Sequence, residues 1–332
     1  MARRRCLRTA VEEMDTTMNT DMRGGGRRVV VTGGAGFIGS HLVDRLVALG
    51  YFVTVLDDLS TGRMENISHL AEHLLCRFVP GSILDRMLLK EMFKDATYVF
   101  HQAAIPSVPR SIISPEATHE VNATGTLYVL IAARDAGVKK LVFASSSSVY
   151  GDSPTLPKTE DMPPNPLSPY AVAKLAAEAY CGVFSTVYGL PTVALRYFNV
   201  FGPRQDPNSE YAAVIPKFIR AALRGEPLTV YGSGNQTRDF TYVEDVVNAN
   251  VRAATGEATG VLNIACGTRI TITELARVIC ELTGSSSAIA HLPTRPGDIE
   301  HSLADTTRAA GFGWTSETSL SQGIESTIRA FS

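Results

Sequence analysis

The sequence predicts an α/β protein with a doubly wound parallel sheet and a smaller, mixed α/β lobe. Three observations support this prediction. Strand-like apolar runs alternate with helical patterns up to about residue 195, a glycine-rich turn follows the first run, and the alternation breaks down after Asn199. Because 332 residues are many for one hydrophobic core, we expect the lobes to be unequal in size.

The first elements form a complete βαβ unit. Three valines at 29–31 predict a buried strand, residues 40–49 have the apolar spacing of a helix, and residues 51–56 predict a second strand. The turn after the first strand has the spacing GxxGxxG, formed by Gly33, Gly36 and Gly39. Such a turn brings backbone close to a pyrophosphate, and the next helix offers its N-terminus to the phosphates. The unit therefore predicts a Rossmann-type nucleotide site.

Asp57 and Asp58 stand at the tip of the second strand. A carboxylate at this place accepts hydrogen bonds from the adenosine ribose and repels a 2′-phosphate. Arg63 is near in the sequence, but no arginine directly adjoins Asp57. The pattern favours NAD over NADP as the cofactor.

The alternation continues through the large lobe and then loosens. Apolar patterns predict a strand end at 79–83, a helix at 84–94, a strand at 98–101, a helix opening at Asn122 and running to 136, strands at 141–144 and 192–195, a helix at 214–223 and a short strand at 228–231. We expect His101 to be a strand-end histidine satisfied by backbone groups rather than a base. Four serines, Ser145 to Ser148, follow a strand at the sheet edge where open α/β sheets bind ligands.

The stretch from Ser168 to Lys174 predicts an acid/base pair. Ser168 and Pro169 suit the N-cap and first position of a helix that runs to Tyr188 and ends at Gly189. Tyr170 and Lys174 then lie one turn apart on the same face. A nearby ammonium stabilises a phenolate, so we expect Lys174 to lower the Tyr170 pKa. Such a pair can take a proton from a hydroxyl.

Composition narrows the function classes. The formal net charge of −2 gives no electrostatic case for a nucleic acid partner or an anionic membrane, and no apolar run is long enough for a membrane span. Five scattered cysteines without a CxxC argue against disulfides and a metal site, and for a reducing, cytoplasmic location. Residues 1–26 are basic, then polar, and are expected to be a disordered extension, unless the true start is Met22.

Several motifs together resemble one family. They are Thr32 to Gly39, Asp57-Asp58, Ser146, Tyr170 with Lys174, and Arg196-Tyr197-Phe198-Asn199. Their combination resembles the extended short-chain dehydrogenase/reductases of the NAD-dependent epimerase/dehydratase type, and more narrowly the UDP-glucose and UDP-N-acetylglucosamine 4-epimerases. The likeness covers about residues 27–330, with an NAD-binding domain at 27–195 and a mainly substrate-binding, interleaved lobe at 196–332.

The resemblance implies a tightly held NAD and a transient oxidation. By it, Tyr170 removes the proton of the sugar 4-hydroxyl while hydride passes from C4 to the cofactor. The 4-keto sugar turns over, and hydride returns to the other face and inverts C4. Lys174 would hold the nicotinamide ribose, and Ser146 would hydrogen-bond the reacting oxygen.

The resemblance also implies binding residues. The cofactor would contact Gly33, Gly36, Phe37, Ile38, Gly39, Asp57, Asp58, Ser82, Ile83, Gln102, Ala103, Asn122, Tyr170 and Lys174. The UDP-sugar would contact Ser146, Ser147, Asn199, Ala213, Val214, Arg238, Arg295, Asp298 and Ser302. Two arginines suit a diphosphate through charge-assisted hydrogen bonds. A homodimer is expected through the Tyr170 helix, with Val183 and Phe184 as outer residues.

Differences within the family point to a substrate. Related dehydratases carry an acidic pair before the Val-Tyr-Gly, and decarboxylases a Glu, where this chain has Ser147 and Ser148. Epimerases restricted to non-acetylated sugars carry a Tyr at the place of Ser302, which with Ala213 leaves room for an acetamido group. We expect UDP-GlcNAc/UDP-GalNAc interconversion with some action on UDP-glucose/UDP-galactose. A UDP-glucuronate 4-epimerase and a non-catalytic NAD-sensing protein remain alternatives.

Overall fold

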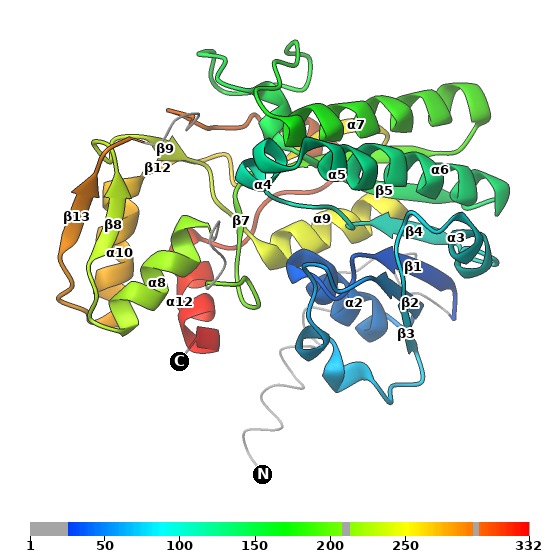
Figure 1. Cartoon of the computed structure of the whole chain (residues 1–332), viewed down its shortest axis with the longest axis horizontal. Coiled ribbons are helices and arrows are strands. Elements are labelled where there is room, and N and C mark those ends of the chain that lie inside the picture. Colours follow the sequence, from blue (N-terminus) through cyan, green and yellow to red (C-terminus); the bar gives the residue numbers. More distant parts are fainter. Residues whose placement is uncertain (1–25, 208–212, 295–298, 332) are drawn as a thin grey trace.

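The computed structural model describes residues 26–207, 213–294 and 299–331. A seven-stranded, fully parallel sheet in the order β11-β6-β5-β4-β1-β2-β3 forms the large lobe (Figure 1). Its strands are β1 (Arg28–Thr32), β2 (Phe52–Asp57), β3 (Cys76–Pro80), β4 (Tyr98–His101), β5 (Lys140–Ser146), β6 (Thr192–Tyr197) and β11 (Gly260–Ile264). The predicted doubly wound sheet is confirmed.

Helices cover both faces of the sheet (Figure 1). On one face lie α2 (Phe37–Ala48) and α9 (Val243–Thr255), which contact each other. The other face carries α3 (Arg86–Met92), α6 (Thr126–Asp135) and α7 (Pro169–Tyr188), with the short helices α4 (Val108–Ile113) and α5 (Pro115–His119) beside α7. Helix α11 (Thr307–Gly311) contacts the edge strand β11, so late parts of the chain return to the large lobe.

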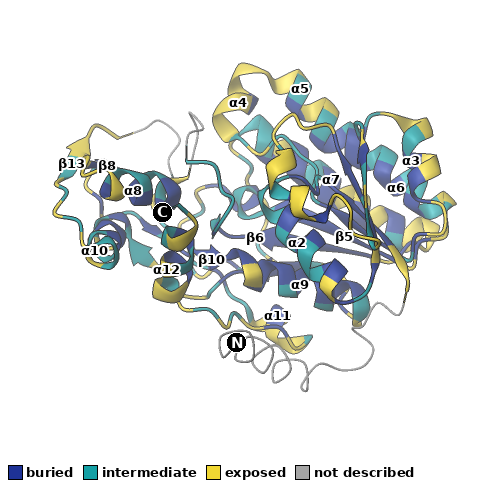
Figure 2. Ribbon diagram, turned by 90° about the horizontal axis from the view of Figure 1, so that it is seen from below, coloured by how far each residue is buried: buried dark blue, intermediate teal, exposed yellow. Residues whose placement is uncertain are grey.

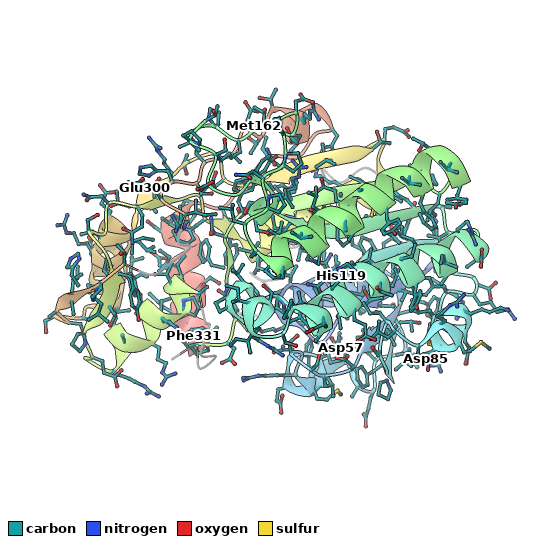
Figure 3. All side chains as sticks on the ribbon, turned by 45° about the horizontal axis from the view of Figure 1, so that its top comes forward. Asp57, Asp85, His119, Met162, Glu300 and Phe331 are labelled. Carbon is teal, nitrogen blue, oxygen red and sulfur yellow. The ribbon has the colours of Figure 1, made fainter. Side chains whose placement is uncertain are left out.

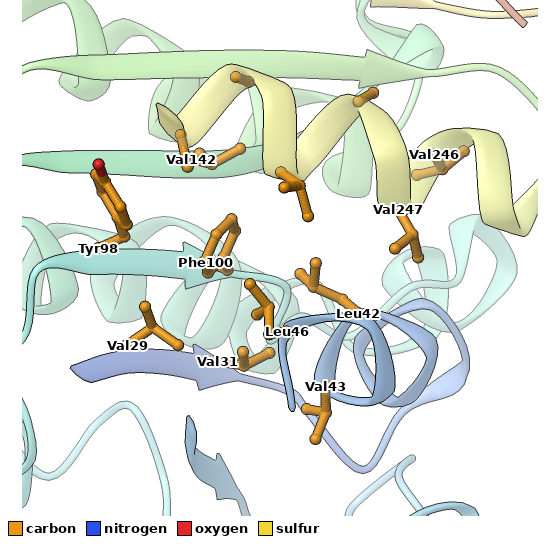
Figure 4. Packing of buried hydrophobic residues seen from close by; sticks show 14 of the residues in the cluster. Val29, Val31, Leu42, Val43, Leu46, Tyr98, Phe100, Val142, Val246 and Val247 are labelled. Carbon is orange, nitrogen blue, oxygen red and sulfur yellow. The ribbon is translucent and has the colours of Figure 1, made fainter. Parts of the chain in front are cut away.

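The strands are apolar on both sides because each face is covered. In β1, Val29 and Val31 enter the core under α2 and α9, while Val30 enters the core on the opposite face. Figure 4 shows the first of these cores, where Leu42 and Leu46 of α2 approach Phe100 of β4. Burial is accordingly highest in the central strands β1, β4, β5 and β6, and exposed surface appears on the outer sides of α4 and α5 (Figure 2).

The smaller lobe has a core of its own. Three amphipathic helices, α8 (Val214–Leu223), α10 (Ile272–Thr283) and α12 (Leu320–Phe331), pack beside the parallel pair β8 (Leu228–Tyr231) and β13 (Ile289–Leu292). Short strand pairs link the lobes: β7 (Val200–Phe201) with β10 (Thr241–Tyr242), and β9 (Thr237–Arg238) with β12 (Ile270–Thr271).

The predicted bounds of β4, β8, α7 and α8 are confirmed. The predicted start of a helix at Asn122 is wrong, because the helical stretch already begins at α5, where Pro115 occupies the first turn. Asn122 lies in a π-helical turn (Glu120–Gly125) that joins α5 to α6. Its polar side chain is buried and hydrogen-bonded to the backbone of Ile105, so Asn122 does not cap the start of a helix. Among the described residues, no helix combines the length and apolar character that a bilayer crossing needs.

Candidate active site

Helix α7 presents the predicted acid/base pair to the carboxyl end of β5. Ser168 caps the helix by accepting the amide of Ala171 at 3.2 Å, and Gly189 ends it in a left-handed conformation. Lys174 is buried, and its Nζ donates to the carbonyl of Ala144 at 2.8 Å. The same Nζ lies 6.0 Å from the centre of the Tyr170 ring.

Burial dominates the proton affinities of this pair. Burial raises the pKa of Tyr170, while a hydrogen bond with Ser146 acts in the opposite direction. Burial also lowers the pKa of Lys174, to about 8. The expected lowering of the Tyr170 pKa by Lys174 is therefore wrong for the protein alone. The reason is that the ammonium is directed at a backbone carbonyl, and the desolvation of the phenol outweighs its hydrogen bond with Ser146.

A cavity of about 250 Å³ runs from the glycine turn to this pair. It is lined by every residue that we predicted to contact the cofactor except Ser82 and Asn122: Gly33, Gly36, Phe37, Ile38, Gly39, Asp57, Asp58, Ile83, Gln102, Ala103, Tyr170 and Lys174. Residues that the sequence analysis missed also line it, among them Ser60, Thr61, Pro106, Val121 and Tyr197. Tyr197 belongs to the Arg-Tyr-Phe-Asn motif, so a signal for it was present.

The glycine turn fits a dinucleotide. Gly33 has a φ of +71°, and a Cβ there would lie 2.6 Å from the amide nitrogen of Ala103. A Cβ at Gly39 would lie 2.0 Å from the carbonyl oxygen of Gly33. The first turn of α2 has neither a side-chain cap nor an acidic residue, so its amides are left for an anion. These are the features that a bound pyrophosphate requires.

Asp57 is oriented toward the same cavity. Its two carboxylate oxygens accept the amides of Ala35 at 2.9 Å and Leu59 at 2.8 Å. Burial raises its pKa, although these hydrogen bonds oppose the shift. Arg63 makes an ion pair with Asp206 at 2.5 Å, which engages the nearest arginine. The arrangement fits an adenosine ribose without a 2′-phosphate.

Three polar residues of this region have structural partners. The Ser82 hydroxyl accepts the amide of Leu84, and the Asn122 carboxamide bonds both the amide and the carbonyl of Ile105. His101 is buried between the hydroxyls of Thr32 and Thr126, at 2.7 and 2.9 Å. His101 is therefore satisfied as expected, but by side chains rather than backbone, and burial lowers its pKa to about 3.

A second, smaller cavity lies beside the first. It brings together four predicted substrate residues, Ser147, Asn199, Arg238 and Ser302, from both lobes. The remaining lining residues are Tyr150, Gly151, Lys158, Phe198, Ile299 and His301, which sequence reasoning missed. Ser145 lines the first cavity and Ser147 the second, while Ser146, between them in the chain, lines neither and is hydrogen-bonded to Tyr170.

The other predicted substrate residues lie elsewhere. Ala213 and Val214 begin helix α8 and do not line either cavity. Arg295 and Asp298 fall outside the described residues. Figure 3 shows Asp57 among the elements of the large lobe and Glu300, the neighbour of the lining residues Ile299 and His301, on the side of the small lobe.

Comparisons with known proteins identify the family. Residues 29–265 match the model of the NAD dependent epimerase/dehydratase family. A UDP-glucose 4-epimerase of Mycolicibacterium smegmatis is 43% identical over 310 residues, covering 92% of this chain and 98% of the relative.

Two solved structures are similar over the same length. A UDP-N-acetylglucosamine 4-epimerase from Methanobrevibacter ruminantium, in complex with UDP-N-acetylmuramic acid, has a TM-score of 0.90 at 43% identity, covering 92% of this chain and 98% of that one. A UDP-glucose 4-epimerase of Thermus thermophilus in complex with NAD has a TM-score of 0.84 at 39% identity, with the same coverage. The chain therefore belongs to the NAD-dependent epimerase/dehydratase family.

Proposed function

We propose that this protein is an NAD-dependent UDP-sugar 4-epimerase. The observation that carries the proposal is the catalytic group itself: Tyr170 and Lys174 line the same cavity as the glycine turn, and Ser146 is hydrogen-bonded to Tyr170. The similarity to UDP-sugar 4-epimerases over almost the whole chain supports the same activity. The serines at 147 and 148 offer no carboxylate for an elimination.

The cofactor would be held by the glycine turn, the amides of α2 and the Asp57 carboxylate. When bound, NAD supplies a group that accepts hydride from the sugar C4 and returns it. Tyr170 takes the proton of the 4-hydroxyl, and Ser146 holds the reacting oxygen through a hydrogen bond. When the carbonyl of the 4-keto sugar presents its other face, the proton goes back from Tyr170 to the oxygen. The same base serves both directions.

Lys174 and the arginines would have electrostatic roles. In the protein alone the Lys174 ammonium is directed at Ala144; with cofactor and substrate bound it would stabilise the phenolate that forms during proton transfer. Arg238, and Arg295 by the family resemblance, would bind the diphosphate of the UDP-sugar. Asn199 is held by a hydrogen bond from its amide to the carbonyl of Asp239, at 2.8 Å, and faces the smaller cavity.

For the substrate we propose UDP-GlcNAc and UDP-GalNAc. Ser302 lines the smaller cavity with a short side chain, and a tyrosine at this place would fill space beside the sugar. Activity on UDP-glucose is expected as well, since a smaller C2 substituent fits the same space. UDP-glucuronate is the substrate to test next if neither sugar is converted.

The experiment is incubation of the purified protein with UDP-GlcNAc and, separately, UDP-glucose, without added NAD, followed by chromatography. Faster formation of UDP-GalNAc than of UDP-galactose is the expected result. UDP-galactose alone would retain the mechanism and overturn the choice of substrate. Conversion of no UDP-sugar, UDP-glucuronate included, would overturn the proposed function in favour of a non-catalytic NAD-binding protein.

We also propose that two copies pair through the outer face of α7. Val172, Val183 and Val187 are 48%, 45% and 67% exposed there, and Ile112 and Ile113 of α4 are exposed nearby. Phe184, the other residue expected on this face, is buried in the core instead and cannot contribute. An exposed apolar face of this kind is typical of an interface between subunits.

A further inference from the structure

A buried carboxylate lies one turn beyond the acid/base pair. Glu178 continues the four-residue spacing of Tyr170 and Lys174 on α7, and its side chain is only 6% exposed. Its carboxylate accepts a hydrogen bond from the Ser145 hydroxyl at 2.6 Å. Arg196 donates to the same carboxylate twice, from Nε at 3.0 Å and from Nη2 at 2.5 Å. Neither the acid/base chemistry nor cofactor binding uses this group directly.

The carboxylate joins the three elements that carry the site. Ser145 of β5 and Arg196 of β6 are direct neighbours in the parallel register, so both side chains can meet one group on α7. Ser145 immediately precedes Ser146, and Arg196 immediately precedes Tyr197 of the cofactor cavity. Together with the bond from Lys174 to Ala144, α7 is attached to two consecutive residues at the end of β5.

The buried pair of Glu178 and Arg196 is better suited to holding α7 and β6 in a fixed arrangement than to stabilising the fold. The side chains of Arg196 and Glu178 are 4% and 6% exposed, and desolvating two charges offsets most of their attraction. A two-point contact between a guanidinium and a carboxylate, however, defines both distance and orientation. The Arg196 guanidinium also packs on the ring of Tyr150, 4.6 Å from its centre, and Tyr150 lines the smaller cavity.

We propose that Glu178 is a positioning residue: through Ser145 and Arg196 it sets the distance between the Ser146 hydroxyl on β5 and the Tyr170 hydroxyl on α7. This inference rests on the proposed 4-epimerase activity for its kinetic test, but not for its structural one. A misplacement of about 1 Å between reacting groups can lower a rate about 100-fold. A smaller displacement of Ser146 is therefore enough to be measured.

Ser145→Ala is the decisive variant, because it removes the bond from Glu178 to β5 and leaves both the ion pair between α7 and β6 and the bond from Lys174 to Ala144 intact. Ser185→Ala is the matched control. Ser185 also joins α7 to a strand, since its hydroxyl bonds Thr192 of β6 at 2.9 Å, but it lies at the far end of the helix from Tyr170. Ser145→Thr restores a hydroxyl and serves as the rescue. Glu178→Gln leaves Arg196 buried without its counter-charge and is used only if it folds.

For Ser145→Ala we expect kcat to fall about tenfold with KM changed less than threefold, consistent with a displacement below 1 Å. The acid limb of its pH–rate profile should move to higher pH, because the hydrogen bond from Ser146 is what opposes the rise in the Tyr170 pKa. Ser145→Thr should recover most of kcat. Ser185→Ala should lower the melting temperature as much as Ser145→Ala does, with kcat and the pH profile unchanged. An equal loss of kcat in the two alanine variants, or no loss in either, would overturn the inference.

A second readout does not depend on activity. Crystal structures of the wild type and Ser145→Ala, both with NAD, should show the distance from Ser146 Oγ to Tyr170 Oη lengthened in the variant. An unchanged distance overturns the positioning role even if the kinetics change. Absence of epimerisation by the wild type with a lengthened distance in the variant would refute the proposed function and leave the positioning role standing.

Discussion

Replacing Gly33 by alanine tests how the glycine turn is built. Two separate penalties can be worked out from the structure. The φ of +71° belongs to the left-handed region, which costs an alanine about 1–2 kcal/mol. The new Cβ would also lie 2.6 Å from the amide nitrogen of Ala103, where ordinary contact begins at 3.4 Å, so the backbones must separate by 0.8 Å (3.4 − 2.6).

That separation acts on a tightly bonded junction. The amide of Gln102 donates to the carbonyl of Thr32 at 3.0 Å, and this bond ties the end of β4 to the start of the turn. Forcing extra atoms into a packed site costs about 1–3 kcal/mol, so Gly33→Ala should lower the free energy of unfolding by about 2–5 kcal/mol in total. NAD affinity should fall too, because Gln102 and Ala103 line the cofactor cavity.

Gly50→Ala separates the two penalties. Gly50 has a similar φ of +82°, but a Cβ there would meet nothing within 4 Å. It should therefore lose only the conformational part, about 1–2 kcal/mol, and keep the affinity for NAD. Urea denaturation of the cofactor-free proteins and titration calorimetry with NAD measure both quantities. If Gly33→Ala is no more destabilised than Gly50→Ala and binds NAD equally well, the account of the close approach is refuted.

Three further predictions concern the substrate, acid stability and assembly. Ser302→Tyr should abolish turnover of UDP-GlcNAc while UDP-glucose is still epimerised, because only the acetamido group needs the space. The control is Ser233→Tyr, which replaces an exposed serine of the same lobe. Unchanged UDP-GlcNAc turnover in Ser302→Tyr would contradict the size argument. The buried His101 has a pKa lowered to about 3, so its contribution to stability is complete above the unfolded value of 6.5 and is lost as pH falls toward 3, by up to about 1.4 kcal/mol per pH unit. In His101→Gln the free energy of unfolding, measured by denaturation between pH 6.5 and 4, should depend less on pH than in the wild type. The control His69→Gln, at an exposed histidine, should behave as the wild type does. The same pH dependence in all three proteins would rule the explanation out. Val187→Glu on α7 should give monomers in light scattering, whereas Leu74→Glu, 94% exposed on another surface, should leave a dimer; a dimer in both would place the interface elsewhere.

Most of the large lobe was predictable because its signals are local. The spacing of apolar residues in β4 and α7, the cap at Ser168 and the glycine at 189 each act within a few residues, so the sequence contains them in full. The start of the helical stretch that leads into α6 was not predictable from local signals. Asn122 is a polar residue that is buried by its contacts with Ile105, seventeen positions away. A polar residue such as Asn122 is typical of the start of a helix, but in the folded chain its carboxamide bonds the backbone of Ile105 instead.

Sequence alone determined the identity of the chemical groups: the glycine turn, Asp57 at the end of β2, and the spacing of Tyr170 and Lys174. These groups belong to short motifs whose residues are close together in the chain, so each motif can be recognised from the sequence. Tertiary structure decided the environment of those groups. It directs Lys174 to Ala144 and desolvates the Tyr170 phenol, so the phenol pKa rises rather than falls. It also assembles the smaller cavity from Ser147, Arg238 and Ser302, and the Glu178 contacts from three separate elements. Proton affinity and the distances between groups depend on which distant segments exclude water and pack together, and this information exists only after the chain has folded.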